Sequence, residues 1–186
     1  MDILGVDIFD VLIVAVWAML PAYVPNNVAV IAGGGAPIDG GRTWNGERIL
    51  GDGKTWRGTI AGVTAGTLLA AGMNAMSATA SDVFSVSLPD FPAIVMVAMP
   101  LGAMLGDMGA SFLKRRTGRR RGAAFPGVDQ LDFVVMALLL TSITAPKWTL
   151  ETFTLPVLTV VVVVTPFLHL TTNMLAYMLG LKNEPW

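Results

Sequence analysis

The sequence predicts an all-α integral membrane protein of about five transmembrane helices, and three observations support this class. Hydrophobic residues make up 54% of the 186 residues and charged residues only 13%, whereas a soluble domain usually carries about a quarter charged residues. The apolar residues form long runs with few charges, of roughly the 20 residues that a membrane-spanning helix needs. The basic residues gather between these runs. The composition therefore indicates a chain that is largely surrounded by lipid.

Each predicted span is a mainly apolar run; the spans cover residues 8–31, 59–80, 91–113, 131–145 and 153–179. The segment before the first span lacks the basic region of a signal peptide, so we expect it to be the polar edge of that helix. The fourth run is short, and we expect its helix to begin inside the preceding loop. The fifth run contains β-branched residues at 160–164, which a membrane helix tolerates well.

The basic residues predict the orientation of the spans. Eleven of the twelve lysines and arginines lie in the loops at about 32–58 and 114–130 or follow the last span as Lys182. Only Lys147 falls on the other side. Positively charged loops stay in the cytoplasm, so the two loops are predicted to be cytoplasmic, with the N-terminus outside and the C-terminus inside.

Small residues recur at every fourth position in the second and third spans. They are Gly58, Gly62 and Gly66 in the second span, and Gly102, Gly106 and Ala110 in the third. Such stripes allow helix backbones to approach closely in lipid, so they predict a tightly packed bundle. No internal repeat is visible, which gives no support to an inverted-repeat transporter.

The first cytoplasmic loop, residues 33–58, is rich in glycine and carries Arg48, Lys54 and Arg57. Glycines allow phosphate oxygens to approach the backbone amides, and arginine can hold phosphate with two hydrogen bonds. The loop is not a Walker motif, because Arg48 stands where that motif needs its first glycine. The pattern favours a loop that binds an anionic ligand; the alternative is a basic loop that only enforces topology.

The second loop predicts a metal and phosphate site. Asp107 lies about two helical turns before Lys114, so we expect it below the membrane surface, where an ionisable side chain is usually functional or paired. Asp129 and Asp132 are three residues apart and share a helix face if the fourth helix has begun. Three carboxylates beside six basic residues suit Mg²⁺ next to a polyphosphate. The alternative is that the aspartates only pair with the arginines.

Three polar residues within the spans have open interpretations. Asn26 and Asn27 follow Pro25 near the cytoplasmic end of the first span, where they either bind substrate or satisfy backbone groups freed by proline. His169 stands in the last span with no evident partner, so a packed or interfacial histidine is expected rather than a catalytic base. The chain has no cysteine, which excludes disulfides and thiolate metal sites.

The second loop resembles the signature of the CDP-diacylglycerol synthases. The matching residues are Gly106, Asp107, Ser111, Lys114, Arg115, Gly118, Pro126, Gly127, Asp129 and Asp132. It departs from the bacterial pattern at Arg119, Arg120, Arg121, Gly122 and Val128. These departures and the first half of the chain are similar to the archaeal branch, the CDP-archaeol synthases. The shared features there are Pro21, Ala22, Tyr23, Asn26, residues 37–39 and residues 50–58.

The resemblance implies one transmembrane catalytic domain over residues 1–186 that transfers CMP from CTP to an anionic isoprenoid-ether glycerol phosphate. It implies Mg²⁺ as cofactor, held by Asp107, Asp129 and Asp132, which together with Lys114 form the expected catalytic set. The expected substrate-binding residues are Asn26, Asp39, Asp52, Lys54, Thr55, Arg57, Ser111 and Arg115. The site would face the cytoplasm of a multi-pass cell-membrane protein, with no nucleic-acid partner and an open oligomeric state. The alternatives are another phospholipid nucleotidyl- or phosphotransferase and an anion transporter.

Overall fold

The computed structural model describes residues 2–3, 6–119, 125 and 127–181. Arg120, Arg121, Gly122, Pro126 and Lys182, on which the sequence arguments drew, lie outside the described residues. The described part forms the helices α1 (Ile8–Ala32), α2 (Trp56–Phe84), α3 (Ala93–Arg116), α4 (Val128–Thr144), α5 (Pro146–Thr152) and α6 (Leu155–Met178). Two antiparallel pairs of short strands accompany them: β1 (Asp2–Ile3) with β2 (Val6–Asp7), and β3 (Thr43–Trp44) with β4 (Glu47–Arg48). The predicted all-α class is confirmed.

Among the described residues, α1, α2, α3 and α6 are long and apolar enough to cross a membrane. The fourth predicted span corresponds to α4, which has 17 residues and begins inside the preceding loop, as expected. α2 is longer than predicted because Thr55 caps its start and the left-handed Ser85 ends it. Pro146 starts the separate short helix α5 between α4 and α6, because proline cannot continue the hydrogen bonding of the preceding helix.

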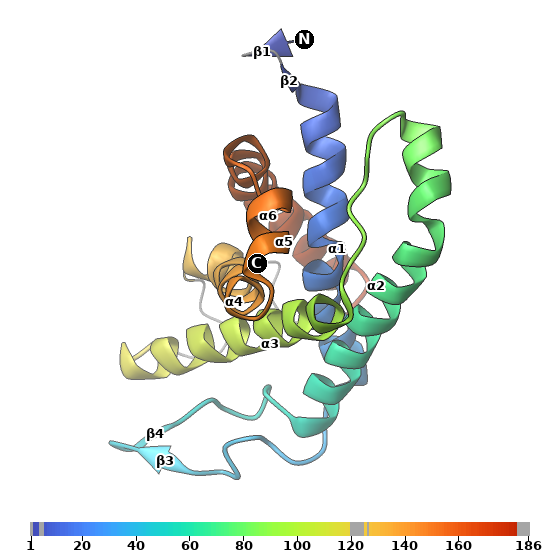
Figure 1. The fold of residues 1–186 in the computed structure, drawn as a ribbon. Coiled ribbons are helices and arrows are strands. Elements are labelled where there is room, and N and C mark those ends of the chain that lie inside the picture. The colour runs from blue at the N-terminus through green and yellow to red at the C-terminus, as the bar shows by residue number, and fades with distance from the viewer. Residues whose placement is uncertain (1, 4–5, 120–124, 126, 182–186) are drawn as a thin grey trace.

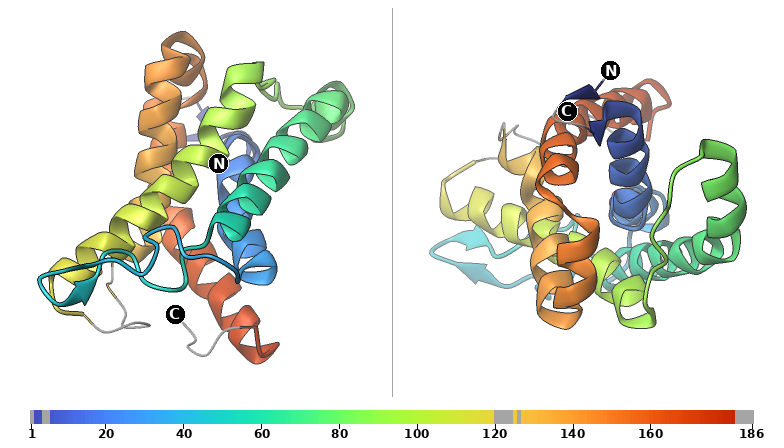
Figure 2. Two further views of the ribbon diagram at one scale, coloured as in Figure 1. Left: turned by 90° about the horizontal axis from the view of Figure 1, so that it is seen from below. Right: turned by 45° about the horizontal axis from the view of Figure 1, so that its top comes forward.

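The helices pack as a bundle in which α3 lies against α4 and α1 against α2, while α6 contacts α1 and α4 (Figures 1 and 2). The predicted glycine stripes lie at these crossings. A Cβ atom at Gly66 would lie 2.7 Å from the carbonyl oxygen of Pro21, and one at Gly106 would lie 2.7 Å from the Cα of Phe133. Because backbone atoms face the glycines, the helix pairs could not approach so closely with larger residues.

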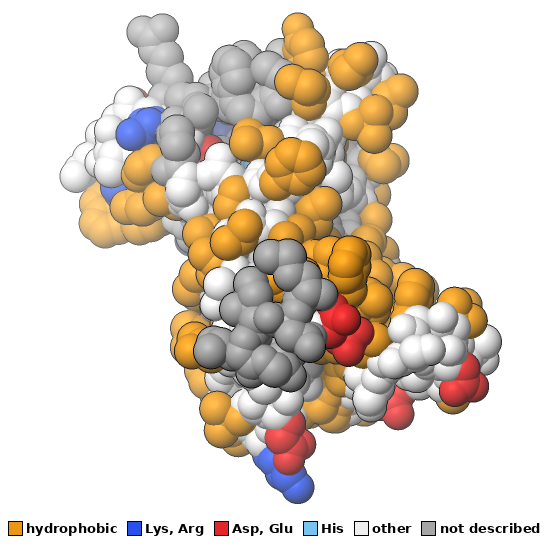
Figure 3. Space-filling view, turned by 90° about the horizontal axis from the view of Figure 1, so that it is seen from above, with side chains coloured by type: hydrophobic (Ala, Val, Ile, Leu, Met, Phe, Trp, Pro, Cys, Tyr) orange, Lys and Arg blue, Asp and Glu red, His pale blue; other side chains and the backbone are white. Residues whose placement is uncertain are grey.

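The outer surface of the bundle is apolar. Leu68 on α2 and Phe167 and Met178 on α6 expose 66%, 68% and 76% of their surface. Figure 3 shows hydrophobic side chains over much of one face, with a few charged side chains scattered among them. Large apolar side chains directed outward on long helices fit a lipid environment.

Candidate functional site

A cavity of about 690 Å³ lies between α1, the start of α2, α3, α4 and α6. Its lysine and aspartate side chains come from the start of α2, from α3 and from α4, and they are Lys54, Asp107, Asp129 and Asp132. Its apolar lining comes mainly from α1 and α6 and includes Val16, Leu20, Val24, Leu168, Leu175 and Leu179. The cavity therefore joins a charged region to an apolar groove.

Lys54 reaches the cavity from the residues just before α2. Its ammonium group forms a salt bridge with the carboxylate of Asp107 on α3. The backbone fixes this position, because the amide of Ile38 donates to the Lys54 carbonyl at 2.8 Å and the amide of Trp56 donates to the carbonyl of Ala36 at 3.2 Å. Thr55 then caps α2 by accepting a hydrogen bond from the Gly58 amide at 3.2 Å. The loop thus holds one ammonium group against the helix that carries Asp107.

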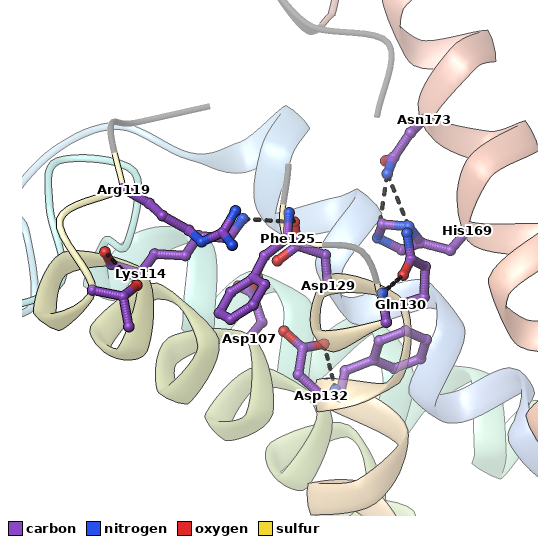
Figure 4. A network of polar contacts seen from close by, with 12 residues as sticks. Asp107, Lys114, Arg119, Phe125, Asp129, Gln130, Asp132, His169 and Asn173 are labelled. Atoms are coloured by element: carbon purple, nitrogen blue, oxygen red, sulfur yellow. Dashed lines mark hydrogen bonds and ion pairs between the residues drawn. The ribbon is translucent and has the colours of Figure 1, made fainter. Parts of the chain in front are cut away.

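The close crossing of α3 and α4 brings three carboxylates to the same cavity (Figure 4). Gly106 faces the backbone of α4 at Asp132 and Phe133, so Asp107, the next residue, lies beside Asp132. Asp129 accepts hydrogen bonds from the ammonium group of Lys114 at 2.7 Å and from the amide of Phe125 at 2.9 Å. Among the described side chains, no lysine or arginine forms a salt bridge with Asp132.

The carboxylates do not form a ready-made metal cluster. Within the described part of the chain, no three His, Cys, Asp or Glu side chains lie close enough together to hold a metal ion. Asp107 and Asp129 each pair with a lysine instead. Magnesium in nucleotide sites commonly uses one or two carboxylates together with phosphate oxygens and water. The oxygen donors at the cavity fit that mode of binding, in which the nucleotide completes the set of ligands.

Asp39 organises the first loop and does not line the cavity. Its side chain is 1% exposed and receives two hydrogen bonds from the Arg48 guanidinium group, at 2.6 and 3.2 Å. The amides of Gly41, Leu50 and Gly51 donate to the same carboxylate at 3.0–3.1 Å. These donors stabilise the charged form, so the pKa of Asp39 lies well below its ordinary value of 3.8.

The strands β3 and β4 are attached to the end of α3 through Arg116. Its guanidinium group donates hydrogen bonds to the carbonyl oxygens of Trp44 at 2.6 Å and Arg48 at 2.9 Å. It also lies over the Trp44 ring, 5.3 Å from the ring centre. The first loop and the end of α3 therefore form one unit at the charged end of the bundle (Figure 2).

Six of the residues predicted for the site line the cavity: Asn26, Lys54, Thr55, Asp107, Asp129 and Asp132. The other six do not: Asp39, Asp52, Arg57, Ser111, Lys114 and Arg115. Asp52 pairs with Arg48 at 2.5 Å, and Arg57 donates to the carbonyl of Ala32 at 2.7 Å, which ties the start of α2 to the end of α1. Arg115 donates to the carbonyl of Arg119 at 3.0 Å.

Asn26 and Asn27 both line the cavity but differ in their hydrogen bonds. Asn27 donates to the Tyr23 carbonyl at 3.2 Å and so serves the backbone of α1. Asn26 lines the cavity, and its side-chain oxygen is buried with no hydrogen-bond partner among the described residues.

The sequence interpretation missed several polar residues of the cavity. Asn173 is a partner of His169, with its amide nitrogen 3.2 Å from the ring nitrogens, so the expectation of no nearby partner is wrong. Thr165, His169 and Asn173 line the cavity from one stripe of α6. The signal for this stripe was present, because the three residues are four positions apart within an apolar run.

Comparison with known proteins shows a consistent set of relatives. A family model described as CarS-like, CDP-archaeol synthase, matches residues 8–186. The CDP-archaeol synthase of Halobacterium salinarum is 62% identical over 180 residues, which are 97% of this chain and 99% of the relative. That of Haloarcula marismortui is 63% identical over 177 residues, 95% of this chain and 98% of the relative. That of Methanosarcina acetivorans is 47% identical over 175 residues, 90% and 100% of the two chains.

A solved structure has the same fold. It is described as an intramembrane enzyme for archaeal membrane lipid biosynthesis, and it superposes with a TM-score of 0.65 at 35% sequence identity. The similarity covers 86% of this chain and 92% of the solved one. The similarity therefore includes most of the helical bundle that encloses the cavity.

Proposed function

From the premise that this chain belongs to the CDP-archaeol synthase family, we propose that its charged cavity is the active site for transfer of CMP from CTP to a lipid phosphate. The protein is a multi-pass membrane cytidylyltransferase with CDP-archaeol synthase activity, which acts in archaeal membrane lipid biosynthesis. This activity implies CTP and an archaetidic acid within the membrane as substrates. One observation supports the assignment to this cavity most strongly: Lys54 and three carboxylates share it with an apolar groove.

The proposed reaction joins two anions. An oxygen of the lipid phosphate forms a bond to the α-phosphorus of CTP, and the bond from that phosphorus to the bridging oxygen of the pyrophosphate breaks. The lipid phosphate is already ionised near neutral pH, so the reaction needs no general base. Positioning and charge stabilisation then account for most of the catalysis.

Lys54 is the proposed phosphate-binding residue. Its ammonium group lies at the cavity beside the start of α2, where the helix dipole favours negative charge. The salt bridge to Asp107 holds the ammonium in place before substrate binds. A bound triphosphate would share this charge with Asp107, which brings the nucleotide next to α3.

Magnesium is the proposed cofactor, held by Asp107 and Asp132 together with the phosphate oxygens of CTP. When bound there, Mg²⁺ would supply positive charge that stabilises the negative charge of the phosphates. Asp129 supports this region through Lys114, with which it forms a salt bridge of 2.7 Å. The chemistry of the donors supports this assignment, because carboxylate oxygens are the protein ligands that magnesium prefers.

We place the active site on the cytoplasmic side of the membrane. The loops of residues 32–58 and 114–130 carry ten of the twelve lysines and arginines, and the charged end of the cavity lies next to both. The positive-inside rule assigns such loops to the cytoplasm. CTP would then enter from the cytosol while the lipid enters from the apolar groove.

The function is tested by measuring pyrophosphate release from detergent-purified protein. The reactions contain CTP with an isoprenoid-ether glycerol phosphate, with a diacyl glycerol phosphate, or with no lipid, each with and without Mg²⁺. We expect release that requires both the ether lipid and Mg²⁺. Release without added Mg²⁺, in the presence of a chelator, would exclude the proposed cofactor. Equal rates with both lipids would remove the proposed preference for the ether lipid.

A further inference from the structure

A second group of polar side chains lines the cavity on the side of α1 and α6. The hydroxyl groups of Tyr23 and Thr165 share a hydrogen bond of 2.8 Å between the two helices. One turn further along α6, His169 lies within 3.2 Å of the Asn173 amide nitrogen. Figure 4 shows His169 and Asn173 on α6, next to the carboxylates of α3 and α4. We call Tyr23, Thr165, His169 and Asn173 the neutral polar band.

Burying the polar groups of the neutral polar band within a membrane costs free energy, unless they are paired or bind a ligand. Thr165 is fully buried and Asn173 is 6% exposed, and buried polar groups within a bilayer are usually paired or functional. Other threonines of α6 satisfy their hydroxyls locally: Thr159 and Thr171 both donate to the carbonyl one turn earlier, at 2.9 Å. Thr165 instead bonds across to α1, so it faces the cavity and not its own helix.

The band has hydrogen-bonding capacity left for a ligand. Two hydroxyl groups that share one hydrogen bond use only one of their two hydrogens, so the Tyr23 and Thr165 pair retains one donor. The buried side-chain oxygen of Asn26, one turn from Tyr23 on α1, has no partner among the described residues. Donors and acceptors of this kind suit a neutral polar group with several oxygens.

The position of the band favours the lipid over the nucleotide. Its residues lie on α1 and α6, which also supply the apolar lining of the cavity, including Leu20, Val24 and Leu168. All the charged side chains of the cavity lie on the opposite side, at α2, α3 and α4. Phe133 separates the two regions, with its ring 5.9 Å from that of Tyr23 and 6.3 Å from that of His169. A group bound at the band would therefore lie between the apolar groove and the carboxylates.

We infer that the neutral polar band binds the glycerol portion of the lipid acceptor and holds its phosphate against the charged side of the cavity. The ether oxygens of such a lipid accept hydrogen bonds, and the retained hydroxyl donor of the Tyr23 and Thr165 pair can supply one. This inference rests on the proposed function, because it assigns a role within the same cavity. The residues of the neutral polar band would then determine the affinity for the lipid acceptor and not for CTP.

The test uses isosteric variants with matched controls from the same chain. The double variant Tyr23→Phe/Thr165→Val removes both hydroxyls of the shared hydrogen bond, because either hydroxyl alone would keep one hydrogen for the lipid. Tyr177→Phe and Thr171→Val make the same changes at exposed positions of α6 that do not line the cavity. Pyrophosphate release is measured against lipid concentration at saturating CTP, and against CTP at saturating lipid. We expect the KM for lipid to rise roughly tenfold in the double variant, which is the loss of about one hydrogen bond. The KM for CTP and both control variants should stay within about twofold.

A second measurement separates failure of the inference from failure of the proposed function. The thermal stability of purified wild type and His169→Phe is recorded with increasing ether-lipid phosphate and no CTP. The phenylalanine keeps a ring beside Phe133 and removes the nitrogens. We expect lipid to raise the Tm of wild type much more than that of the variant. Active variants with an unchanged KM for lipid, or with a raised KM for CTP, would overturn the inference. An inactive wild type whose Tm shift depends on His169 would overturn the proposed function and leave the lipid subsite standing.

Discussion

At the scale of single residues, Lys54 and Asp107 form the ion pair that faces the proposed nucleotide site. A phosphate that binds Lys54 gains a charge-assisted hydrogen bond, which is worth more than a neutral one. We predict that Lys54→Ala raises the KM for CTP by roughly 10- to 100-fold, the loss of about 1.5–3 kcal/mol. Lys147→Ala is the matched control, because Lys147 is 87% exposed on α5 and does not line the cavity. If both variants have the wild-type KM for CTP, Lys54 does not bind CTP.

The second prediction at this scale concerns the charge of the Asp132 carboxylate. Its carboxylate lines the cavity, and none of the described salt bridges includes it. Asp132→Asn keeps the shape and removes the charge, so we expect kcat to fall at least about 100-fold with little change in Tm. Asp82→Asn, on the exposed end of α2, is the control. Normal turnover by Asp132→Asn would exclude this side chain from magnesium binding.

The residues of the site differ in how well the sequence predicts them. Asp107 could be expected at the cavity because an acidic side chain within an apolar run is costly, and Asp129 and Asp132 because their spacing of three residues suits one helix face. Asp39 was expected to bind substrate, yet its carboxylate is surrounded by Arg48 and the amides of its own loop. Such a network depends on how the loop folds back, which spacing alone does not reveal. The pairing of His169 with Asn173 could have been predicted, because the two residues are four positions apart on one helix.

At the scale of the elements, the first loop depends on the charge of Asp39. Its pKa in the folded protein is lower than the 3.8 of the free group, because Arg48 and three amides stabilise the carboxylate. The resulting stabilisation is complete above about pH 4 and is lost as the pH falls through the lower, folded pKa. We predict that Asp39→Asn lowers the Tm by about 3–6 °C at pH 7. The difference in Tm between wild type and variant should decrease as the pH falls below about 4. A difference that stays constant with pH would show that the charge of Asp39 does not stabilise the loop.

The crossing of α3 and α4 positions Asp107 beside Asp132, and Gly106 is the residue that permits it. A methyl group at this position would meet the Cα of Phe133 at 2.7 Å, and the backbone cannot yield without moving α4. Gly106→Ala should therefore cost about 1–3 kcal/mol of stability and lower kcat, despite the better helix propensity of alanine. Gly109→Ala on the same helix meets no atom within 4 Å and should be neutral or slightly stabilising. Equal Tm and kcat in the two variants would contradict this account.

At the scale of the whole molecule, the fold brings a cytosolic anion and a membrane lipid together. The glycine-rich first loop and the helices α3 and α4 supply the charged side of the cavity, and α1 and α6 supply the apolar side. The sequence predicts the helices well, because long apolar runs leave few alternatives. It does not predict which helices enclose the cavity, since all of them are apolar on several faces. That arrangement depends on close glycine contacts such as the one between Gly62 and the Pro25 carbonyl.

The number of times the chain crosses the membrane depends on α4. Its 17 residues extend for roughly 26 Å at 1.5 Å per residue, slightly less than the bilayer core of about 30 Å. Because α4 packs along most of α3 and leads into α5, we expect it to cross with a local adjustment of the bilayer. The first loop and α5 would then lie on opposite sides of the membrane.

The chain has no cysteine, so single cysteines can report their side of the membrane. Glu47→Cys labels the strand β4 in the first loop, and Lys147→Cys labels α5; both positions are exposed. In intact cells, a membrane-impermeant maleimide should react with the cysteine at position 147 and reach that at position 47 only after lysis. Three helices, α2, α3 and α4, separate the two positions, so labelling from opposite sides requires α4 to cross. If neither cysteine reacts with the maleimide in intact cells, α4 does not cross the membrane. If only the cysteine at position 47 reacts in intact cells, the charged cavity lies outside, away from cytosolic CTP.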